Sequence, residues 1–361
     1  MPRIQTLVRR CALIGVALAA STAVAVPAIP LANASNASTN PVLEPWGIYK
    51  GTGDGLWPAY QSSTGTDHDL LGKMALHARV RAYGQWIPTG TIKSLISSDI
   101  VQEQGGNPNV LVWMAIFRLW PHEEVACKQP MTSAEQQDYR SCIDQAAAGI
   151  GRSRVGIVLE PDLPMTTICW RPKVRAGLAR YAAQTLGALP NATVYLDGGS
   201  SDWLKVPALA KLLVSAGIQY VHGISLGASH HVSTASEVRY CRLVGLALAK
   251  AGYPNKRCVV DTSDNGHAYS NKQFATKYPG GNVTNPPACT TMSQKVCVAL
   301  GIPPTTDVSN AAWKLPATVA GFAKTWVDAY IWTGHPWKIN NGHDFDMQHA
   351  LDAAPTDPLD R

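Results

Sequence analysis

Acidic residues follow directly on three apolar runs of strand length. The runs 155–159, 194–196 and 259–260 continue into Glu160-Pro161-Asp162, Asp197 and Asp261, and a further run ends at Trp332. Carboxyl groups that meet in one place can give protons to a substrate and take protons from water. An aspartate at the end of a strand can instead cap the next helix, so each segment alone leaves both interpretations open. Three segments with the same placement favour a shared site over capping alone.

The apolar runs alternate with amphipathic stretches. Seven runs have the length of strands: 80–86, 110–117, 155–159, 193–196, 220–226, 258–261 and 329–332. Helical spacing occurs over 172–186, 207–216 and 235–251, and Gly252 is placed to end the last helix. This alternation predicts an α/β fold with a parallel sheet covered on its outer face. About seven such units favour a closed or nearly closed (β/α) barrel over a doubly wound open sheet, so the acids and Trp332 should meet at one rim.

The composition is that of a globular protein with a large core. The chain has 361 residues, 46% hydrophobic and 16% charged, which excludes a disordered or collagen-like protein. Its net charge of +6 includes Arg3, Arg9 and Arg10, and without them 28 basic residues face 25 acidic ones, a balance of +3. Because this excess is small and forms no basic run, we expect no nucleic-acid partner.

Residues 1–34 have the organisation of a secretory signal peptide. A basic head, 1–10, precedes an apolar run, 11–26, and the small residues Ala32-Asn33-Ala34 suit signal peptidase. The run is shorter than the roughly 20 apolar residues that cross a bilayer, so a retained membrane anchor is the weaker alternative. We therefore expect secretion and no membrane partner. Residues 35–45 are small and polar and predict a short solvated linker before a single catalytic-size domain, 46–361.

The cysteines indicate disulfides. Once Cys11 leaves with the signal peptide, seven remain: Cys127, Cys142, Cys169, Cys241, Cys258, Cys289 and Cys297. In an oxidising compartment most should pair, and the odd number leaves one thiol over. None forms a CxxC motif, which makes a zinc site the weaker interpretation.

Five ordered motifs point to one family. They are GIVLEPDLP (156–164), VYLDGGSSDWL (194–204), VVDTSDNG (259–266), CVALGIPPT (297–305) and DAYIW (328–332). In this order and spacing they resemble glycoside hydrolase family 6, the inverting β-1,4-glucanases that include secreted bacterial endoglucanases and cellobiohydrolases. The resemblance covers roughly residues 70–340. It implies a distorted barrel of about seven parallel strands and a polysaccharide or oligosaccharide substrate.

The reaction of that family needs two carboxyl functions. One protonates the leaving oxygen and the other takes a proton from water, and an inverting enzyme holds them about 6.5–9.5 Å apart. The resemblance puts the acid in FRLWPHEEVAC (117–127), where a four-residue insertion aligns Glu124 with it. Glu124 could equally be a solvated loop residue. Asp162 matches the family's carboxylate near the acid, and a second acid beside Glu124 would raise its pKa.

Two other family aspartates are replaced here. The one after the first strand aligns with Gly84, and the usual base aligns with Asn340, which cannot accept a proton as a carboxylate does. Losing a general base typically costs about 10²–10⁴ in rate. Asp344 or Asp346 could stand in as the base, another carboxylate could act through water, or the protein could be a feeble glucanase.

The resemblance also implies substrate contacts, from Trp203, Trp332, Asp197, Asp261 and Asn340. The two tryptophans would present flat apolar faces to sugar rings, and core packing is the alternative. Other tryptophans could add to a sugar cleft, and the sequence does not rank them: Trp57, Trp86, Trp120, Trp313 and Trp337. Ser200 and Gly334 replace the family's histidine and lysine, so general glycan binding is better supported than cellulose as the substrate.

Other chemistries lack their motifs. His230, His231, His335 and His343 show no metal-ligand spacing, and an inverting glycosidase needs no metal, so we expect no metal and no cofactor. No GxSxG, P-loop or GxGxxG follows a strand. Two hypotheses remain: a secreted inverting glycoside hydrolase, and a catalytically impaired glycan-binding pseudoenzyme on the same barrel. We expect a monomer in either case.

Overall fold

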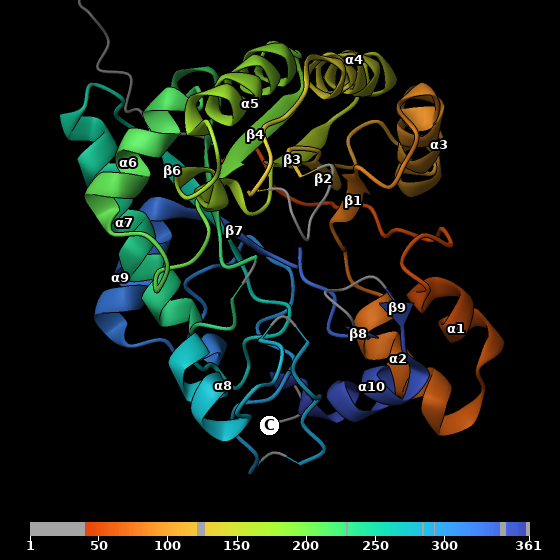
Figure 1. Cartoon of the computed structure of the whole chain (residues 1–361). Helices are drawn as coiled ribbons and strands as arrows, with labels where there is room; N and C mark the ends of the chain where they lie inside the picture. The colour runs from red at the N-terminus through yellow and green to blue at the C-terminus, as the bar shows by residue number, and fades with distance from the viewer. Residues whose placement is uncertain are drawn as a thin grey trace, which may run out of the picture. The chain divides into compact units, whose positions relative to one another are not determined.

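The computed structural model describes residues 40–120, 127–228, 230–283, 285–291, 293–339 and 344–358, so the predicted signal peptide lies outside the described residues. Seven parallel strands form one sheet in chain order (Figure 1). They are β1 (Arg81–Gly84), β2 (Val112–Phe117), β3 (Val155–Leu159), β4 (Ala192–Asp197), β5 (Gly223–Leu226), β6 (Arg257–Asp261) and β7 (Val327–Ile331). Each predicted apolar run contains or overlaps one of them, which confirms the predicted parallel sheet.

The sheet curls until its end strands approach each other. β1 and β7 are the ends of the strand order, and the backbone N–H of Val80 donates a 2.9 Å hydrogen bond to the carbonyl of Trp332. Val80 precedes β1 and Trp332 follows β7, so the amino end of one strand meets the carboxyl end of the other. This geometry is the nearly closed, distorted barrel that the sequence predicted.

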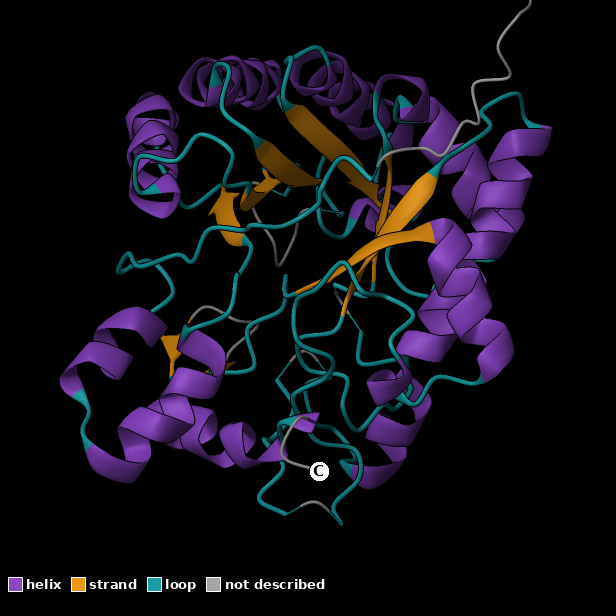
Figure 2. Ribbon diagram, turned by 180° about the vertical axis from the view of Figure 1, so that it is seen from behind, coloured by secondary structure: helices purple, strands orange, loops and turns teal. Residues whose placement is uncertain are grey.

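Helices cover the outer face of the sheet (Figure 2). They are α3 (Ile92–Gln104), α4 (Ser133–Ile150), α5 (Pro172–Gly187), α6 (Val206–Ser215), α7 (Thr234–Lys250) and α9 (Ala317–Trp326). The predicted helices 172–186, 207–216 and 235–251 are confirmed as α5, α6 and α7. The α4 helix starts with a capping box, in which Thr132 and Glu135 satisfy each other's backbone N–H.

Side chains alternate between the two faces of each strand. In β2, Val112 and Met114 face the helices and belong to the large outer core, whereas Trp113 and Ala115 fill the interior of the barrel. The same alternation places Tyr195 of β4 inside, and Asp197, two residues on, shares its face. An inward face on each strand is what brings strand-end side chains to one rim.

Residues 40–45 differ from a solvated linker at Asn40 and Val42, whereas residues 43–45 are exposed. Val42 is fully buried in the interior cluster of the barrel, and the Asn40 side chain donates a 2.7 Å hydrogen bond to the carbonyl of Asp328. Trp46 then forms a bridge with Leu111 at the start of β2. Because the segment is mostly small and polar, its composition gave no sign that Val42 packs inside the amino end of the barrel.

A smaller layer lies beside the carboxyl end of β7. It contains α1 (Leu56–Ser62), α2 (Gly65–Ala75), α10 (Met347–Ala353) and the hairpin of β8 (Lys338–Ile339) and β9 (Asp344–Phe345). Its core includes Trp332 and Trp337, and a buried ion pair of 3.0 Å joins Arg79 to Asp54. The short helix α8 (Asn271–Lys277) follows β6.

Six of the seven predicted cysteines pair, which confirms the expected disulfides. The bonds are Cys127–Cys169, Cys241–Cys258 and Cys289–Cys297, and buried Cys142 is the thiol left over. No helix in the described ranges combines the length and the apolar character needed to span a bilayer.

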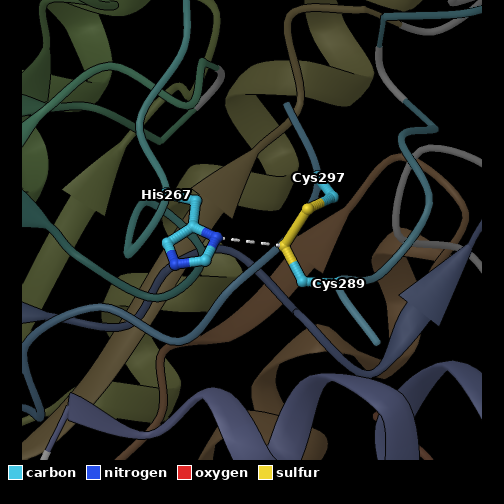
Figure 3. A group of neighbouring side chains, drawn as sticks. All are labelled: His267, Cys289 and Cys297. Carbon is cyan, nitrogen blue, oxygen red and sulfur yellow. Dashed lines mark hydrogen bonds between the residues drawn. A yellow bond between two sulfur atoms is a disulfide. The ribbon is translucent and has the colours of Figure 1, made fainter. Parts of the chain in front are cut away.

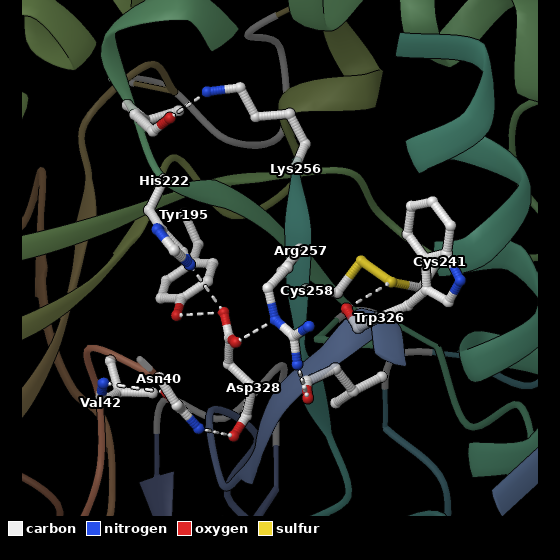
Figure 4. Close-up of polar contacts among 12 residues, drawn as sticks. Asn40, Val42, Tyr195, His222, Cys241, Lys256, Arg257, Cys258, Trp326 and Asp328 are labelled. Carbon is white, nitrogen blue, oxygen red and sulfur yellow. Dashed lines mark hydrogen bonds and ion pairs between the residues drawn. A yellow bond between two sulfur atoms is a disulfide. The ribbon is translucent and has the colours of Figure 1, made fainter. Parts of the chain in front are cut away.

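A buried polar network lies at the amino ends of β6 and β7 (Figure 4). The carboxylate of Asp328 is fully buried and accepts hydrogen bonds from Tyr195 Oη, at 2.9 Å, and Arg257 Nε, at 2.5 Å. His222 Nε2 lies 2.9 Å from the same carboxylate. Asp328 is the extra residue where the register between β6 and β7 shifts, so the bulge turns its side chain into the barrel.

Candidate active site

Asp197 ends β4 inside the carboxyl rim of the barrel. It is fully buried, its Oδ1 accepts a 2.9 Å hydrogen bond from the backbone N–H of Gly199, and its Oδ2 has no partner within the described protein. Burial raises the pKa of Asp197 well above its usual range, and the negative charge of Asp162 raises it further. The protonated form of Asp197 is therefore favoured relative to that of an exposed aspartate.

Asp162 comes from the loop after β3. Its backbone has a φ of +64°, in the left-handed region, and it precedes the short 3-10 helix at Leu163–Thr167. Few residues other than glycine adopt this conformation without strain. The negative charge of Asp162 acts on Asp197, so the segments after β3 and β4 influence each other electrostatically at this rim.

Glu160, in the same segment, is structural. It is fully buried, and its carboxylate accepts hydrogen bonds from the backbone N–H groups of Arg118 and Leu119 and from Tyr139 Oη, at 2.8–3.0 Å. Burial raises the pKa of Glu160 to about 7, although these donors oppose the shift. The side chain ties the end of β2 to the end of β3.

Asp261 ties β6 to the segment after β7. Its Oδ1 accepts from the N–H of Ser263 at 2.8 Å, and its Oδ2 accepts from the N–H of Gly334 at 2.7 Å. Burial raises the pKa of Asp261 to about 7, and the charge of Asp264 adds to the shift. Both oxygens are occupied by backbone groups, so the residue shapes the rim and offers little to a substrate.

Unpartnered polar atoms gather at this rim. Within the described residues, the buried atoms Asp197 Oδ2, Ser200 Oγ, Ser225 Oγ and Thr333 Oγ1 have no hydrogen-bond partner in the protein. They follow or end β4, β5 and β7. Since buried polar groups are normally satisfied, these atoms indicate a place where water or substrate hydroxyl groups bind.

Trp332 does not provide the predicted stacking platform. Only 2% of it is exposed, its indole N–H donates a 2.9 Å hydrogen bond to the carbonyl of Ile302, and His77 packs against its ring. The core-packing alternative is the correct one, because a strand-end side chain here meets the layer of α1, α2 and α10.

Trp203 remains half-buried on the loop after β4. Its ring stacks on the ring of His230 with centroids 5.0 Å apart, and Asp202 holds that histidine at 2.6 Å. The stacking role of Trp203 stays a prediction, and its ring packs on a histidine from the loop after β5.

The remaining predicted site residues lie partly outside the described residues. Glu124 and Asn340 lie outside the described residues, and of Asp344 only the backbone, in β9, is described. Asp346 caps α10, with its carboxylate accepting a 2.7 Å hydrogen bond from the N–H of His349. The structure therefore gives Asp346 a structural task.

Replacing Asp346 by asparagine should separate capping from catalysis. Asparagine caps helices as well as aspartate does, so the melting temperature should change little, whereas alanine should cost about 1 kcal/mol. We expect the Asn variant to retain its rate of polysaccharide hydrolysis, measured as reducing ends released. A fall of about 10² or more in the stable Asn variant would make Asp346 the base.

Sequence reasoning missed two buried ionisable groups at the rim. Glu237 of α7 accepts hydrogen bonds of 2.9 Å from the N–H and Oγ of Ser201, and burial raises its pKa to about 8. His231 lies 3.3 Å from Asp264. Burial lowers the pKa of His231, but the charge and hydrogen bonds of Asp264, together with the charge of Asp261, raise it by more, so the net shift is upward. A glutamate on the apolar face of a predicted helix was the available signal for Glu237.

The raised pKa of Glu237 predicts that the stability of the folded protein falls as the pH rises. Its pKa is higher in the folded protein than the usual 4.5, so protonation favours the folded state below about pH 4.5, and that contribution is lost as the pH rises to about 8. Thermal unfolding between pH 5 and 9 should show this decline, and Glu237→Gln should flatten it. An equally steep profile in the variant would assign the decline to other groups.

His267, Cys289 and Cys297 form a cluster of potential metal ligands in a loop region after β6 (Figure 3). His267 Nδ1 lies 3.5 Å from the sulfur of Cys289. Both sulfurs are joined in a disulfide, whereas metal binding requires thiolates. A cavity of about 410 Å³, lined by residues that include Arg154, Asn191 and His222, lies at the opposite end of the strands from the acids.

Comparisons with known proteins agree with the barrel fold described above. The family model for glycosyl hydrolases family 6 matches residues 124–335, more than half of the chain. The chain belongs to glycosyl hydrolases family 6, which confirms the resemblance found in the sequence.

Named relatives are endoglucanases. Endoglucanase A of Cellulomonas fimi is 29% identical over 211 residues, 58% of this chain and 44% of the relative. Endoglucanase 1 of Streptomyces halstedii is 27% identical over 216 residues, 58% of this chain and 66% of the relative. The matched region thus spans less than two thirds of either protein.

Solved structures share the fold over nearly the whole chain. The endoglucanase Cel6 of Mycobacterium tuberculosis, in complex with methyl-cellobiosyl-4-deoxy-4-thio-β-D-cellobioside, has a TM-score of 0.69 and 23% identity, covering 88% of this chain and 99% of that one. The family 6 enzyme of Orpinomyces sp. Y102 has a TM-score of 0.67 and 15% identity, covering 88% and 98%.

Proposed function

We propose that this protein is a secreted glycoside hydrolase that cleaves β-1,4-glucan or a related polysaccharide with inversion. The observation that carries the proposal is the Asp162–Asp197 pair at the carboxyl rim. Asp197 is fully buried, and its burial, together with the negative charge of Asp162, raises its pKa well above the usual range. Such a pair suits acid-assisted departure of a glycosidic oxygen, since two interacting carboxyl groups separate into a proton holder and a charge.

The steps of the proposed hydrolysis are assigned to different residues of the carboxyl rim. Glu124 donates the proton to the leaving oxygen, as the family alignment suggests, and Asp162 and Asp197 set the charge around it. The unpartnered atoms of Ser200, Ser225 and Thr333 bind sugar hydroxyl groups. Asp344, or another carboxylate acting through water, serves as the base in place of Asn340. Removal of residues 1–34 on export leaves the barrel as the mature enzyme, and it acts as a monomer.

A test combines a product assay with stereochemistry. The purified protein should release reducing ends from a member of a β-glucan panel, and NMR should find the product anomer inverted relative to the substrate. Glu124→Gln should abolish most of this release. Retention of configuration would contradict the inverting mechanism, and full activity of Glu124→Gln would remove Glu124 as the acid.

The second candidate is a glycan-binding pseudoenzyme. The residues considered for the catalytic base favour this candidate, because position 340 is asparagine and Asp346 caps α10. Measurable oligosaccharide binding with no turnover over days would select this function over hydrolysis.

A further inference from the structure

Three potential metal ligands meet in the loop region after β6. The ligand atoms of His267, Cys289 and Cys297 all lie within 4.8 Å of one another, and Nδ1 of His267 lies 3.5 Å from the sulfur of Cys289 (Figure 3). Within the described residues, no other group of three histidine, cysteine, aspartate or glutamate side chains brings its ligand atoms this close. The hydrolysis proposed above makes no use of these residues, so the cluster needs an explanation of its own.

The spacing of the histidine nitrogen and the cysteine sulfur is that of a tetrahedral zinc site. Zinc binds a cysteine sulfur at about 2.3 Å and a histidine nitrogen at about 2.0–2.1 Å. With a tetrahedral angle between them, these two atoms lie about 3.5 Å apart. The same separation joins His267 Nδ1 to the sulfur of Cys289. What the cluster lacks for zinc is thiolates, because its two sulfurs are joined to each other.

Backbone hydrogen bonds hold the two cysteines together independently of the disulfide. The N–H of Cys289 donates a 2.8 Å hydrogen bond to the carbonyl of Val298, which directly follows Cys297. The N–H of Val298 donates in turn to the carbonyl of Pro287, at 2.9 Å, and a parallel bridge pairs Val298 with Ala288. The cysteines therefore remain neighbours when the bond between their sulfurs is open.

The segment between the cysteines is held by a side chain of its own. The side-chain oxygen of Gln294 accepts hydrogen bonds from the N–H groups of Thr290, at 2.6 Å, and Thr291, at 3.3 Å. These bonds fix the turn that follows Cys289 without help from the sulfur atoms.

A second bridge positions His267 beside the sulfurs. Asn265 pairs with Ala299, and the N–H of Gly266 donates a 2.9 Å hydrogen bond to the Ala299 carbonyl. A Cβ on Gly266 would lie only 2.1 Å from the carbonyl oxygen of Leu300, so only glycine lets the two segments approach this closely. The next residue, His267, is therefore held in place by backbone contacts.

The surroundings of the cluster suit a metal site that is open on one side. Cys289 and Cys297 are 0% and 3% exposed and pack with Ala299, whereas His267 is half-buried. Buried thiolates need a partner of opposite charge, and a divalent cation supplies it. Zinc with three protein ligands keeps a fourth position for water, which the half-buried histidine leaves accessible here.

We propose that His267, Cys289 and Cys297 bind Zn²⁺ through Nδ1 and both sulfurs once the Cys289–Cys297 bond is reduced. The reductant is a dithiol, which gives two electrons and two protons to the bond, leaves two cysteine thiols and is itself oxidised to a cyclic disulfide. Zn²⁺ then displaces both thiol protons to solvent and forms two S–Zn bonds. In an oxidising medium the disulfide keeps the site closed. This inference is independent of the proposed glycan function.

Zinc titration of the full-length protein before and after reduction tests this site. The protein is reduced with a dithiol, separated from it by anaerobic gel filtration, and titrated with Zn²⁺ in competition with a chromophoric chelator. The reduced protein should bind a Zn²⁺ ion that the oxidised protein does not bind. Losing an outer partner of a metal ligand costs about 10–100-fold in affinity, so losing a ligand, in His267→Ala, should weaken this binding at least about 100-fold.

Matched variants separate this site from the other thiols of the reduced protein. Cys289→Ser combined with Cys297→Ser should remove the binding. Cys241→Ser combined with Cys258→Ser, which removes another buried disulfide, should retain it. His68→Ala is the control for the histidine, because His68 is a half-buried residue of α2, and its affinity for Zn²⁺ should equal that of the wild-type protein.

Several outcomes would overturn the zinc site. They are the absence of zinc binding after reduction, equal binding by the variant without Cys289 and Cys297, an unchanged affinity in His267→Ala, and equal weakening in either control. Loss of the fold on reduction, seen by circular dichroism, would also overturn it, because the backbone contacts would no longer hold the ligands together. Binding that requires reduction and all three residues, with both controls unchanged, supports the inference.

Discussion

Asp328→Ala is expected to lower the free energy of unfolding by about 3–5 kcal/mol, the cost of removing one partner from a buried ion pair. The substitution leaves Arg257 Nε and the fully buried hydroxyl of Tyr195 without their acceptor. The same carboxylate also holds His222. Because these residues come from β4, the start of β5, β6 and β7, the loss should loosen four neighbouring strands at once.

Chemical denaturation followed by tryptophan fluorescence measures this loss. Asp69→Ala is the matched control, because Asp69 is an exposed aspartate of α2, and it should change the free energy by less than about 0.5 kcal/mol. A loss for Asp328→Ala no larger than that of the control would show that the network contributes no net stability.

Asp162→Asn is expected to reduce polysaccharide hydrolysis by about 10²–10⁴, the usual contribution of acid–base chemistry. The negative charge of Asp162 raises the pKa of Asp197, so the neutral amide should lower that pKa. Asp197 then loses its proton at a lower pH. If Glu124 is the acid, it also loses a negatively charged neighbour that raises its pKa, so the alkaline limb of the pH–rate profile should move to lower pH.

Asp144→Asn is the control for charge removal alone. Asp144 is exposed on the outer helix α4, where it accepts a 2.6 Å hydrogen bond from Tyr181 Oη of the neighbouring helix α5. Its rate and pH profile should match those of the wild-type protein. An Asp162→Asn variant with an unchanged profile would remove the acid pair from the mechanism.

Most of the barrel could be predicted from the sequence because its strands are buried on both faces. Continuous apolar runs such as 155–159 have no other simple explanation, and that run coincides with β3. The match of the predicted helices to α5, α6 and α7 follows from the same physics, since a helix that covers a sheet must present one apolar stripe.

The rim could be predicted only in part. The strand-end position places a residue at the rim but does not say whether its side chain faces a cleft or a neighbouring layer. Asp162 acts electrostatically on Asp197, whereas Glu160 and Asp261 are held by backbone N–H groups. Trp332 is buried because helices far away in the sequence pack over it, and such contacts leave no local signal.

The floor of the barrel depends on a segment that composition alone would assign to the tail. Val42 fills the interior cluster, and Asn40 anchors it to β7. A recombinant version that begins at residue 46 would lack Val42, which belongs to the same buried cluster as Val80, Leu111 and Ala329. Trimming should therefore stop before Asn40, and an affinity tag belongs upstream of that residue.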